Sequence, residues 1–97
     1  MSKEMRNVKA RLYIKYGTKC EVCGKEFRES ELTGHHIIMR SKGGSITEDN
    51  ILIACYNCHF GRINHMMYDS EEYWKLMKQS LEHRNKPWGF SWGLFSI

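Results

Sequence analysis

The chain has 97 residues, a net charge of +4 and an apolar fraction of 41%, which together indicate one globular domain rather than a disordered chain. No apolar run reaches the roughly 18 to 20 residues that a membrane helix needs, and residues 1–4 lack the apolar core of a signal peptide. We therefore expect a protein that works inside a cell or virion. The charge is mild, so it suggests a polyanionic partner without establishing one.

The first predicted element is a helix over residues 3–16. Ser2 is a suitable N-cap, and Gly17 stands where a C-terminal cap belongs. Apolar residues at three- and four-residue spacing predict one buried face, made of Met5, Val8, Leu12 and Tyr16. Basic residues are expected to face solvent or phosphate, namely Lys3, Arg6, Lys9 and Lys15.

Two C-x-x-C pairs, Cys20/Cys23 and Cys55/Cys58, follow this helix. Two such turns can aim four thiolates at one ion, with Zn–S bonds of about 2.3 Å. In an intracellular chain this pattern favours zinc over disulfides, so we predict one structural Zn²⁺ held by all four cysteines. Two disulfides or a redox-active pair are the alternatives, although a redox pair would need a βαβ context that the sequence does not suggest.

A strand, a loop, a second strand and a helix are predicted from the middle of the chain onward. Residues 34–38 end in β-branched side chains and residues 50–54 form a short apolar run, so both predict strands. Residues 39–47 contain two adjacent glycines and predict a loop. A helix is expected from residue 56 to about residue 67.

The last third of the chain predicts another helix and an aromatic tail. The helix covers residues 70–84, with Asp69 and Glu72 as an N-terminal capping pair and Pro87 beyond its end. Its apolar face is expected to comprise Tyr73, Trp74, Leu76, Met77 and Leu81. Residues 88–97 alternate large apolar and small side chains, which favours a strand on the protein's own core. Dimerisation, a partner protein or base stacking are the alternatives for this tail.

The segment over residues 20–65 carries the motifs that point to chemistry. They are, in order, the first cysteine pair, Gly34-His35-His36-Ile37-Ile38, Asp49-Asn50, and Cys55-x-x-Cys58-His59. This order resembles the HNH nuclease family, in particular small free-standing endonucleases of phages and bacteria. The family is named for a His, an Asn and a second His, which here would be His36, Asn50 and His59.

The resemblance implies an α+β fold with a ββα-metal (HNH) core and a structural zinc site made of four cysteines. An N-terminal helix and a C-terminal helix plus aromatic tail would flank this core. We expect residues 1–97 to form a single HNH nuclease domain. Its N-terminal helix would lie in residues 1–17, its zinc-stapled core in 18–68, and its C-terminal helix and tail in 69–97.

Phosphodiester hydrolysis needs a base for the attacking water and a cation near the scissile phosphate. A free imidazole titrates at a pH of about 6.5, so His36 suits the role of base. The resemblance implies that His35, which stands where the family often has Asp, and His59 hold a catalytic divalent cation. This cation would be Mg²⁺, Mn²⁺ or Ni²⁺, and imidazole ligands favour the softer metals. Asn50 is expected to brace the loop that presents His36 rather than to reach the metal.

Two geometric points bear on these roles. Adjacent residues of a regular strand face opposite sides, so His35 and His36 share one site only if the strand ends or bulges there. On a continued helix His65 lies about 240° around from His59, which disfavours it as a third ligand. The same helix would place Arg62 on the face of His59.

The predicted function is therefore a metal-dependent DNA endonuclease, nicking or cutting double-stranded DNA with low sequence specificity. Arg40, Lys42 and Arg62 are candidate DNA contacts, together with open backbone N–H groups of Gly43-Gly44. The alternative is a non-catalytic zinc-binding module that binds DNA or protein. The resemblance also suggests a role in phage DNA processing or packaging, a homodimer or packaging protein as partner of the tail, and a cytoplasmic location in a bacterial host.

Overall fold

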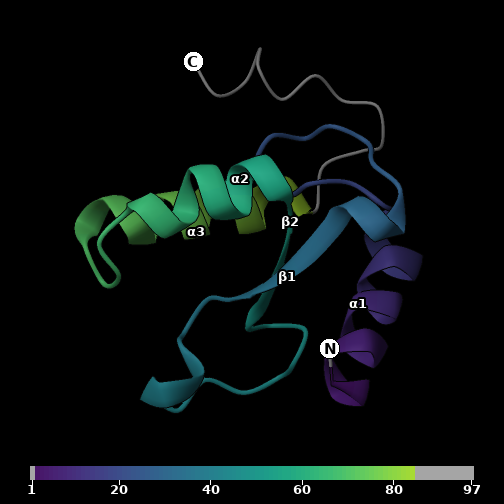
Figure 1. Ribbon diagram of the computed structural model, residues 1–97, viewed down its shortest axis with the longest axis horizontal. Coiled ribbons are helices and arrows are strands. Elements are labelled where there is room, and N and C mark those ends of the chain that lie inside the picture. Colours follow the sequence, from purple (N-terminus) through teal and green to yellow (C-terminus); the bar gives the residue numbers. More distant parts are fainter. Residues whose placement is uncertain (1, 85–97) are drawn as a thin grey trace.

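The computed structural model describes residues 2–84, so the predicted aromatic tail over residues 88–97 lies outside the described part. The main elements run in the order α1 (Lys3–Tyr16), β1 (Leu32–His36), β2 (Ile51–Cys55), α2 (Tyr56–Gly61) and α3 (Glu71–Arg84) (Figure 1). Short 3-10 helices, η1 (Glu29–Glu31), η2 (Arg40–Lys42) and η3 (Ile63–His65), lie in the connections. Among these described elements, no helix has the length and apolar character to cross a bilayer.

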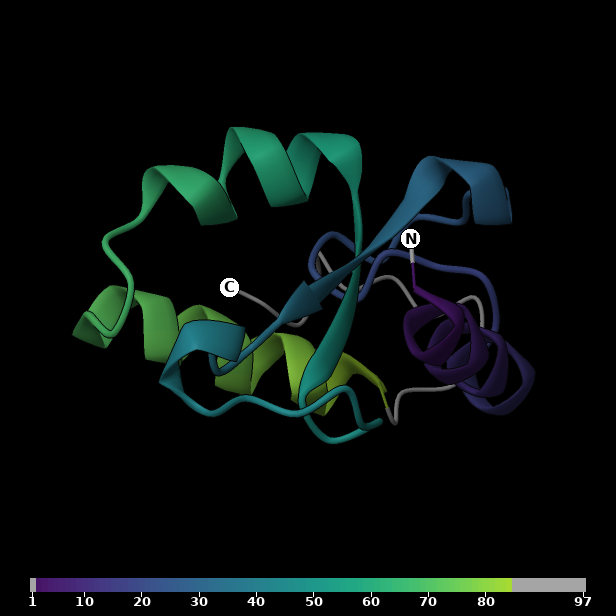
Figure 2. The ribbon, with the colours of Figure 1, turned by 60° about the horizontal axis from the view of Figure 1, so that its bottom comes forward.

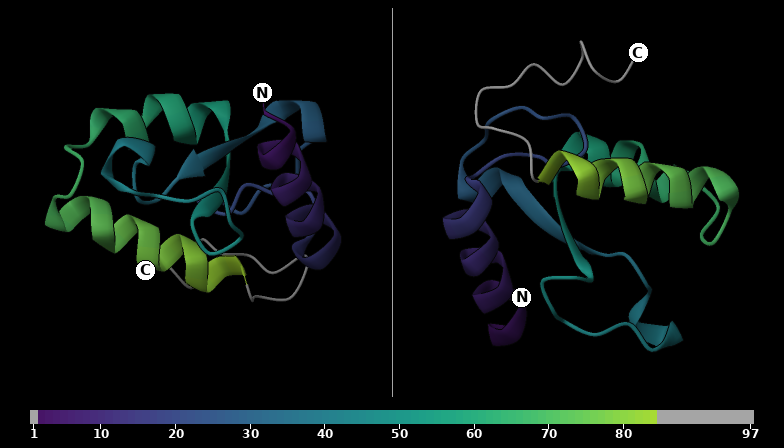
Figure 3. Two further views of the ribbon diagram at one scale, coloured as in Figure 1. Left: turned by 90° about the horizontal axis from the view of Figure 1, so that it is seen from below. Right: turned by 180° about the vertical axis from the view of Figure 1, so that it is seen from behind.

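The two strands form an antiparallel sheet whose register runs from Leu32 opposite Cys55 to His36 opposite Ile51. Helix α1 packs on the face where a Cβ on Gly34 would lie 2.7 Å from Met5 Sδ. Thr33 and His35 point to the other face, where they contact His59 of α2 and Tyr73 of α3. The ribbons of α2 and α3 lie away from α1, with the sheet between them (Figures 2 and 3). Every residue of β2 is buried, so this strand forms the centre of the core. The fold is thus a two-stranded sheet between α1 and the pair α2 and α3.

Helix α1 begins and ends as the sequence predicts. Ser2 Oγ accepts a hydrogen bond from Met5 N at 3.2 Å, and Gly17 has a φ of 86° that favours glycine. The structure corrects the prediction for Lys9, which is buried. Its Nζ donates to the carbonyl oxygen of Leu32 at 2.9 Å, and burial lowers the pKa of this lysine. Lys9 therefore joins α1 to β1 instead of facing solvent.

The bounds of the two strands and the end of α2 differ from the sequence prediction, with β2 shifted by one residue. Strand β1 begins at Leu32 and ends at His36, two residues earlier than predicted. After His36, Ile37 N donates to Asn50 O at 2.8 Å, and the side chain of Asn50 takes over the next bond. Helix α2 stops at Gly61 rather than near residue 67, and the chain continues into η3.

The start of α3 differs from the predicted capping pair. Ser70 Oγ accepts from Tyr73 N at 3.1 Å, so Ser70 rather than Asp69 caps the helix. Asp69 has a φ of 68°, and its carboxylate accepts from Trp74 Nε1 at 2.7 Å. This bond holds Trp74 at the partly exposed edge of the helix, outside the buried face that Tyr73 belongs to.

A buried ion pair, which is not predicted from the sequence, joins the turn after α1 to the end of α3. Glu21 lies between Cys20 and Cys23, and its side chain is 2% exposed. Arg84, at the end of α3, donates from Nη2 to Glu21 Oε1 at 2.8 Å, and Glu21 Oε1 also accepts from Ile53 N at 2.8 Å. The pair thereby fastens α3 to the first cysteine turn and to β2.

Replacing Arg84 by methionine is expected to lower the free energy of unfolding by about 3–5 kcal/mol, because it leaves the Glu21 carboxylate buried without its partner. Urea unfolding of the metal-loaded protein would measure this. The matched control is Arg11→Met, which breaks an exposed pair with Glu48 and should cost about 0–1 kcal/mol. Equal losses in the two variants would contradict the role of the buried pair.

Candidate functional site

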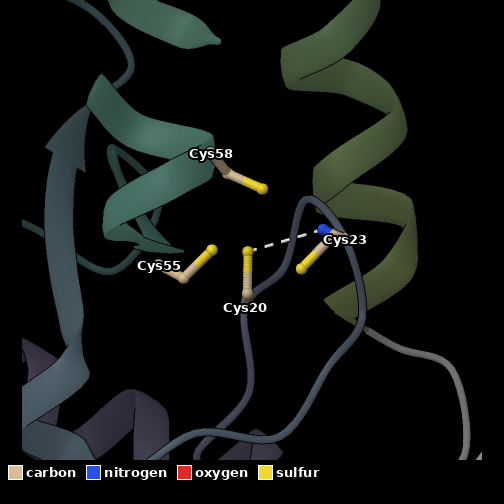
Figure 4. A group of neighbouring side chains, drawn as sticks. All are labelled: Cys20, Cys23, Cys55 and Cys58. Carbon is tan, nitrogen blue, oxygen red and sulfur yellow. Dashed lines mark hydrogen bonds between the residues drawn. The ribbon is translucent and has the colours of Figure 1, made fainter. Parts of the chain in front are cut away.

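The four cysteines converge on one point from two parts of the chain (Figure 4). Cys20 and Cys23 come from the turn after α1, while Cys55 ends β2 and Cys58 lies in the first turn of α2. All four are free thiols, and their sulfur atoms lie within 4.8 Å of one another. Cys23 N donates to Cys20 Sγ at 3.4 Å, and this hydrogen bond lies within the first cysteine turn.

The chemistry of this cluster fits a divalent metal ion such as zinc. Burial and the neighbouring thiols raise the pKa of Cys58 to about 12, so without a metal this thiol resists becoming a thiolate. A bound cation reverses this balance, because its charge stabilises four thiolates at once. The four cysteines are therefore positioned to bind a metal ion such as zinc where the first turn meets α2.

Next to Cys58, His59 faces the sheet and pairs with His35 of β1. The ring centroids of the two histidines are 5.1 Å apart, with an interplanar angle of 71°. A metal–nitrogen bond of about 2.1 Å puts a ring centroid about 3.2 Å from the ion, so two rings on one ion have centroids about 4.5–5.3 Å apart. The observed spacing fits two ligands of a single divalent cation.

Each of these rings has one nitrogen within hydrogen-bond distance of a hydroxyl group. His35 Nε2 lies 2.8 Å from the hydroxyl oxygen of Tyr73 on α3, and His59 Nδ1 lies 2.7 Å from Thr33 Oγ1. Burial, with His59 and His36 nearby, lowers the pKa of His35 to about 4, and burial also lowers the pKa of His59. Both imidazoles are thus neutral at neutral pH, which is the form that binds metals.

Within residues 2–84, no third His, Cys, Asp or Glu side chain joins His35 and His59 in a group placed for one ion. His65 is exposed in η3, because α2 ends before the position that the helical argument assumed. A third protein ligand therefore stays unassigned in the described part of the chain.

His36 is the last residue of β1, and the structure answers the question of its direction. The strand is regular through both histidines, so their side chains leave β1 on opposite faces, yet both residues line one open pocket of about 440 Å³ at the end of the strand. This histidine pocket is also lined by His59 and Arg40. The Nε2 atom of His36 is buried and has no hydrogen-bond partner among residues 2–84.

Asn50 bridges the loop that follows His36. Its Oδ1 accepts from Ile38 N at 2.8 Å, and its Nδ2 donates to Ile38 O at 3.1 Å and to Ser45 O at 2.9 Å. The amide is thereby used on both of its ends by the backbone. This is the bracing arrangement expected from the sequence.

Gly43 and Gly44 of this loop do not have the phosphate-binding role that the sequence predicts. Gly43 N donates to Arg40 O at 3.1 Å, and Gly44 N donates to Met39 O at 3.0 Å. These N–H groups are used within the protein, so the expectation that they are open to a phosphate is wrong. Gly44 is needed for close packing, since a Cβ there would lie 1.8 Å from Ile38 O.

Replacing Gly44 by alanine is expected to open this loop and destabilise the protein by about 1–3 kcal/mol for each buried polar group that loses its partner. The hydrogen bonds between Asn50 and Ile38 would break first, because the new Cβ would also lie 2.9 Å from Asn50 Nδ2. Urea unfolding measures the effect, with Gly61→Ala as the control, since a Cβ on Gly61 meets no atom within 4 Å. A Gly44→Ala protein as stable as the control would contradict this account.

The three basic residues expected near DNA are all exposed, but only Arg40 lines the histidine pocket. Lys42 lies on the same 3-10 helix as Arg40. Arg62 is the C-cap residue of α2, and its N–H donates to Cys58 O. Arg40 is thus the one of these three basic residues that shares a pocket with the histidines.

A two-stranded antiparallel sheet followed by a helix, with a cysteine cluster at their junction, defines a ββα core. A family model for HNH endonucleases matches residues 20–68, and the chain belongs to this family. A search of curated proteins gave no significant match. HNH domains are nuclease-type domains that bind nucleic acid and use a divalent metal.

Two residues that contact the histidines, Thr33 and Tyr73, are not among the site residues predicted from the sequence. Thr33 could have been found, because it lies two residues before His35 and so shares its side of a strand. Tyr73 was assigned only to the apolar face of its helix. Nothing in the sequence indicates that its hydroxyl meets a histidine 38 residues earlier.

Proposed function

We propose that the protein is a metal-dependent endonuclease that hydrolyses phosphodiester bonds in double-stranded DNA, by nicking or by double-strand cleavage, with low sequence specificity. The observation that carries this proposal is the pocket that His35, His36 and His59 line together with Arg40, in a member of the HNH endonuclease family. Three imidazoles and a guanidinium at one open surface suit a phosphate substrate and its hydrolysis.

In this proposal His36 is the general base. Its Nε2 is buried, so Nδ1 is the nitrogen that would take the proton from the attacking water. Asn50 acts as a positioning residue, because its amide fixes the loop that continues from His36. No step requires this amide to touch the substrate.

His35 and His59 would hold one divalent cation, and the four cysteines would hold a separate structural zinc ion. When bound, the cation supplies charge that stabilises the phosphoryl and leaving oxygens. Mg²⁺, Mn²⁺ and Ni²⁺ are the candidates, and two imidazole ligands favour the softer ions. Arg40, together with Lys42 and Arg62, would neutralise phosphates of the DNA backbone, which implies weak sequence preference and marked salt dependence.

The test is conversion of supercoiled plasmid to open-circle or linear DNA by the zinc-loaded protein. Parallel reactions contain no added metal, Mg²⁺, Mn²⁺ or Ni²⁺, and each is repeated with His59→Ala. Cleavage that depends on added metal and is lost in the variant is the expected result. Absence of cleavage with every metal by the folded protein would favour a non-catalytic zinc-binding module that binds DNA or protein.

The proposed setting is DNA processing or packaging in a phage or its bacterial host. It rests on the family resemblance and on the composition of the tail, whose proposed partner is a second copy of the chain or a packaging protein. Gel filtration of a protein shortened before Trp88 tests the tail separately: a folded monomer favours an interface, and an unfolded protein favours a tail that completes the core.

A further inference from the structure

The hydrogen bonds around the two paired histidines determine which ring nitrogen carries the proton. His35 Nε2 lies 2.8 Å from the hydroxyl of Tyr73, and His59 Nδ1 lies 2.7 Å from that of Thr33. A neutral imidazole has one N–H and one lone pair, so each contact can in principle run in either direction.

The protons of both hydroxyl groups are already committed. The Tyr73 hydroxyl donates to the carbonyl oxygen of Ile37 at 2.6 Å, and Thr33 Oγ1 donates to the carbonyl oxygen of Ala54 at 2.8 Å. A hydroxyl has a single proton and a carbonyl oxygen has none, so each hydroxyl can only accept from its histidine. The N–H groups therefore stand on His35 Nε2 and on His59 Nδ1.

We infer that Tyr73 and Thr33 are positioning residues that fix opposite tautomers of the two histidines, leaving lone pairs on His35 Nδ1 and His59 Nε2. The tautomers follow from the protein alone. Their use in holding a cation rests on the proposed function. Ligating histidines in proteins commonly donate their second ring N–H to a neighbouring group, which orients the ring and strengthens the ligand.

The backbone makes this arrangement part of the fold. Ala54 is the register partner of Thr33 across the sheet, so pairing of β1 with β2 itself orients the Thr33 hydroxyl. Ile37 directly follows β1, and Tyr73 reaches it from α3, which lies outside the residues that the family model matches. Phe60 stacks on the His59 ring, with centroids 4.4 Å apart and an angle of 18°, and so restrains its plane. Helix α3 thus contributes to the site although it supplies no ligand.

The two tautomers are unequal in what they need from the protein. A neutral histidine side chain in water prefers the Nε2–H form, which is the form assigned to His35. His59 is assigned the less favoured Nδ1–H form, so it depends more strongly on its hydroxyl partner. Loss of the Thr33 hydroxyl should therefore disturb the site more than loss of the Tyr73 hydroxyl.

Long-range ¹H–¹⁵N correlation spectra of the zinc-loaded protein, without a second metal and at neutral pH, report the tautomer of each histidine directly. We expect Nε2–H for His35 and Nδ1–H for His59. In Thr33→Val, the spectrum of His59 should shift toward Nε2–H while that of His35 stays unchanged. Thr33→Ser keeps a hydroxyl and should restore the original tautomer. The hydroxyl that contacts His35 is removed in Tyr73→Phe, for which Tyr68→Phe is the matched control.

Calorimetric titration with Ni²⁺ gives the second measurement. Thr33→Val should weaken Ni²⁺ binding about 10–100-fold, Tyr73→Phe should weaken it less, and Thr33→Ser should restore it. Opposite or averaged tautomers in the unaltered protein would overturn the inference whatever metal binds. The expected tautomers without any Ni²⁺ binding would support the inference and instead count against the proposed cation site.

Discussion

Removing the metal from the cysteine cluster is expected to unfold the protein. Structural zinc binding in small domains contributes an apparent free energy of about 10–16 kcal/mol near neutral pH, whereas whole domains are stable by only about 5–15 kcal/mol. The cluster brings the turn after α1 together with the end of β2 and the start of α2, so its loss removes a cross-link between them. Glu21, which is buried beside Cys20, would become exposed to solvent as well.

Far-ultraviolet circular dichroism during titration with a chelator, together with metal analysis, would measure this loss. The control is the same chelator saturated with zinc beforehand, and re-addition of zinc should restore the signal. Cys58→Ser should show the same instability without any chelator. A metal-free protein that melts cooperatively at the original temperature would show that the cluster does not hold the fold.

The second large effect is expected from His36→Ala, which should reduce plasmid cleavage about 10²–10⁴-fold, as the loss of a general base does. The fold should persist, because His36 ends β1 and its Nε2 makes no hydrogen bond that the substitution would break. The rate is measured as disappearance of supercoiled plasmid under the metal that gives the highest activity. A thermal melt of the same sample separates loss of chemistry from loss of fold.

His65→Ala is the matched control, since His65 is exposed in η3 and does not line the histidine pocket. This variant should cleave at the rate of the unaltered protein. If His36→Ala also cleaves at that rate, another group activates the water. If both variants lose activity equally, the assignment of the pocket is wrong.

The sequence predicted best those elements whose signals are local. Helix α1 has an apolar face, a capping serine and a terminal glycine, and its bounds are confirmed. The end of β1 was misplaced because Ile37 and Ile38 are good strand residues, yet the side chain of Asn50 replaces a strand partner there. The choice of Asp69 as the cap failed because Ser70, the next residue, offers an equally suitable oxygen.

Long-range polar contacts could not be predicted from spacing. Lys9 follows the pattern of a solvated lysine, but its side chain is buried and its Nζ donates to the carbonyl oxygen of Leu32. Glu21 and Arg84 are 63 residues apart, and no periodicity connects them. At the candidate site, the histidines were found from their motif, whereas the hydroxyls of Thr33 and Tyr73 depend on how the sheet and α3 meet.

Helix α2 has six residues and would not persist in water by itself, since isolated helices shorter than about 12–15 residues are marginal. Its first turn is formed where Cys55 and Cys58 meet the cysteine cluster, and His59 follows directly. The His59 side chain therefore loses its conformational entropy when the chain folds, and not when a divalent cation binds to the histidine pair. In the proposed nuclease, one ion could leave and another enter the histidine pair without any reordering of the helix that presents it.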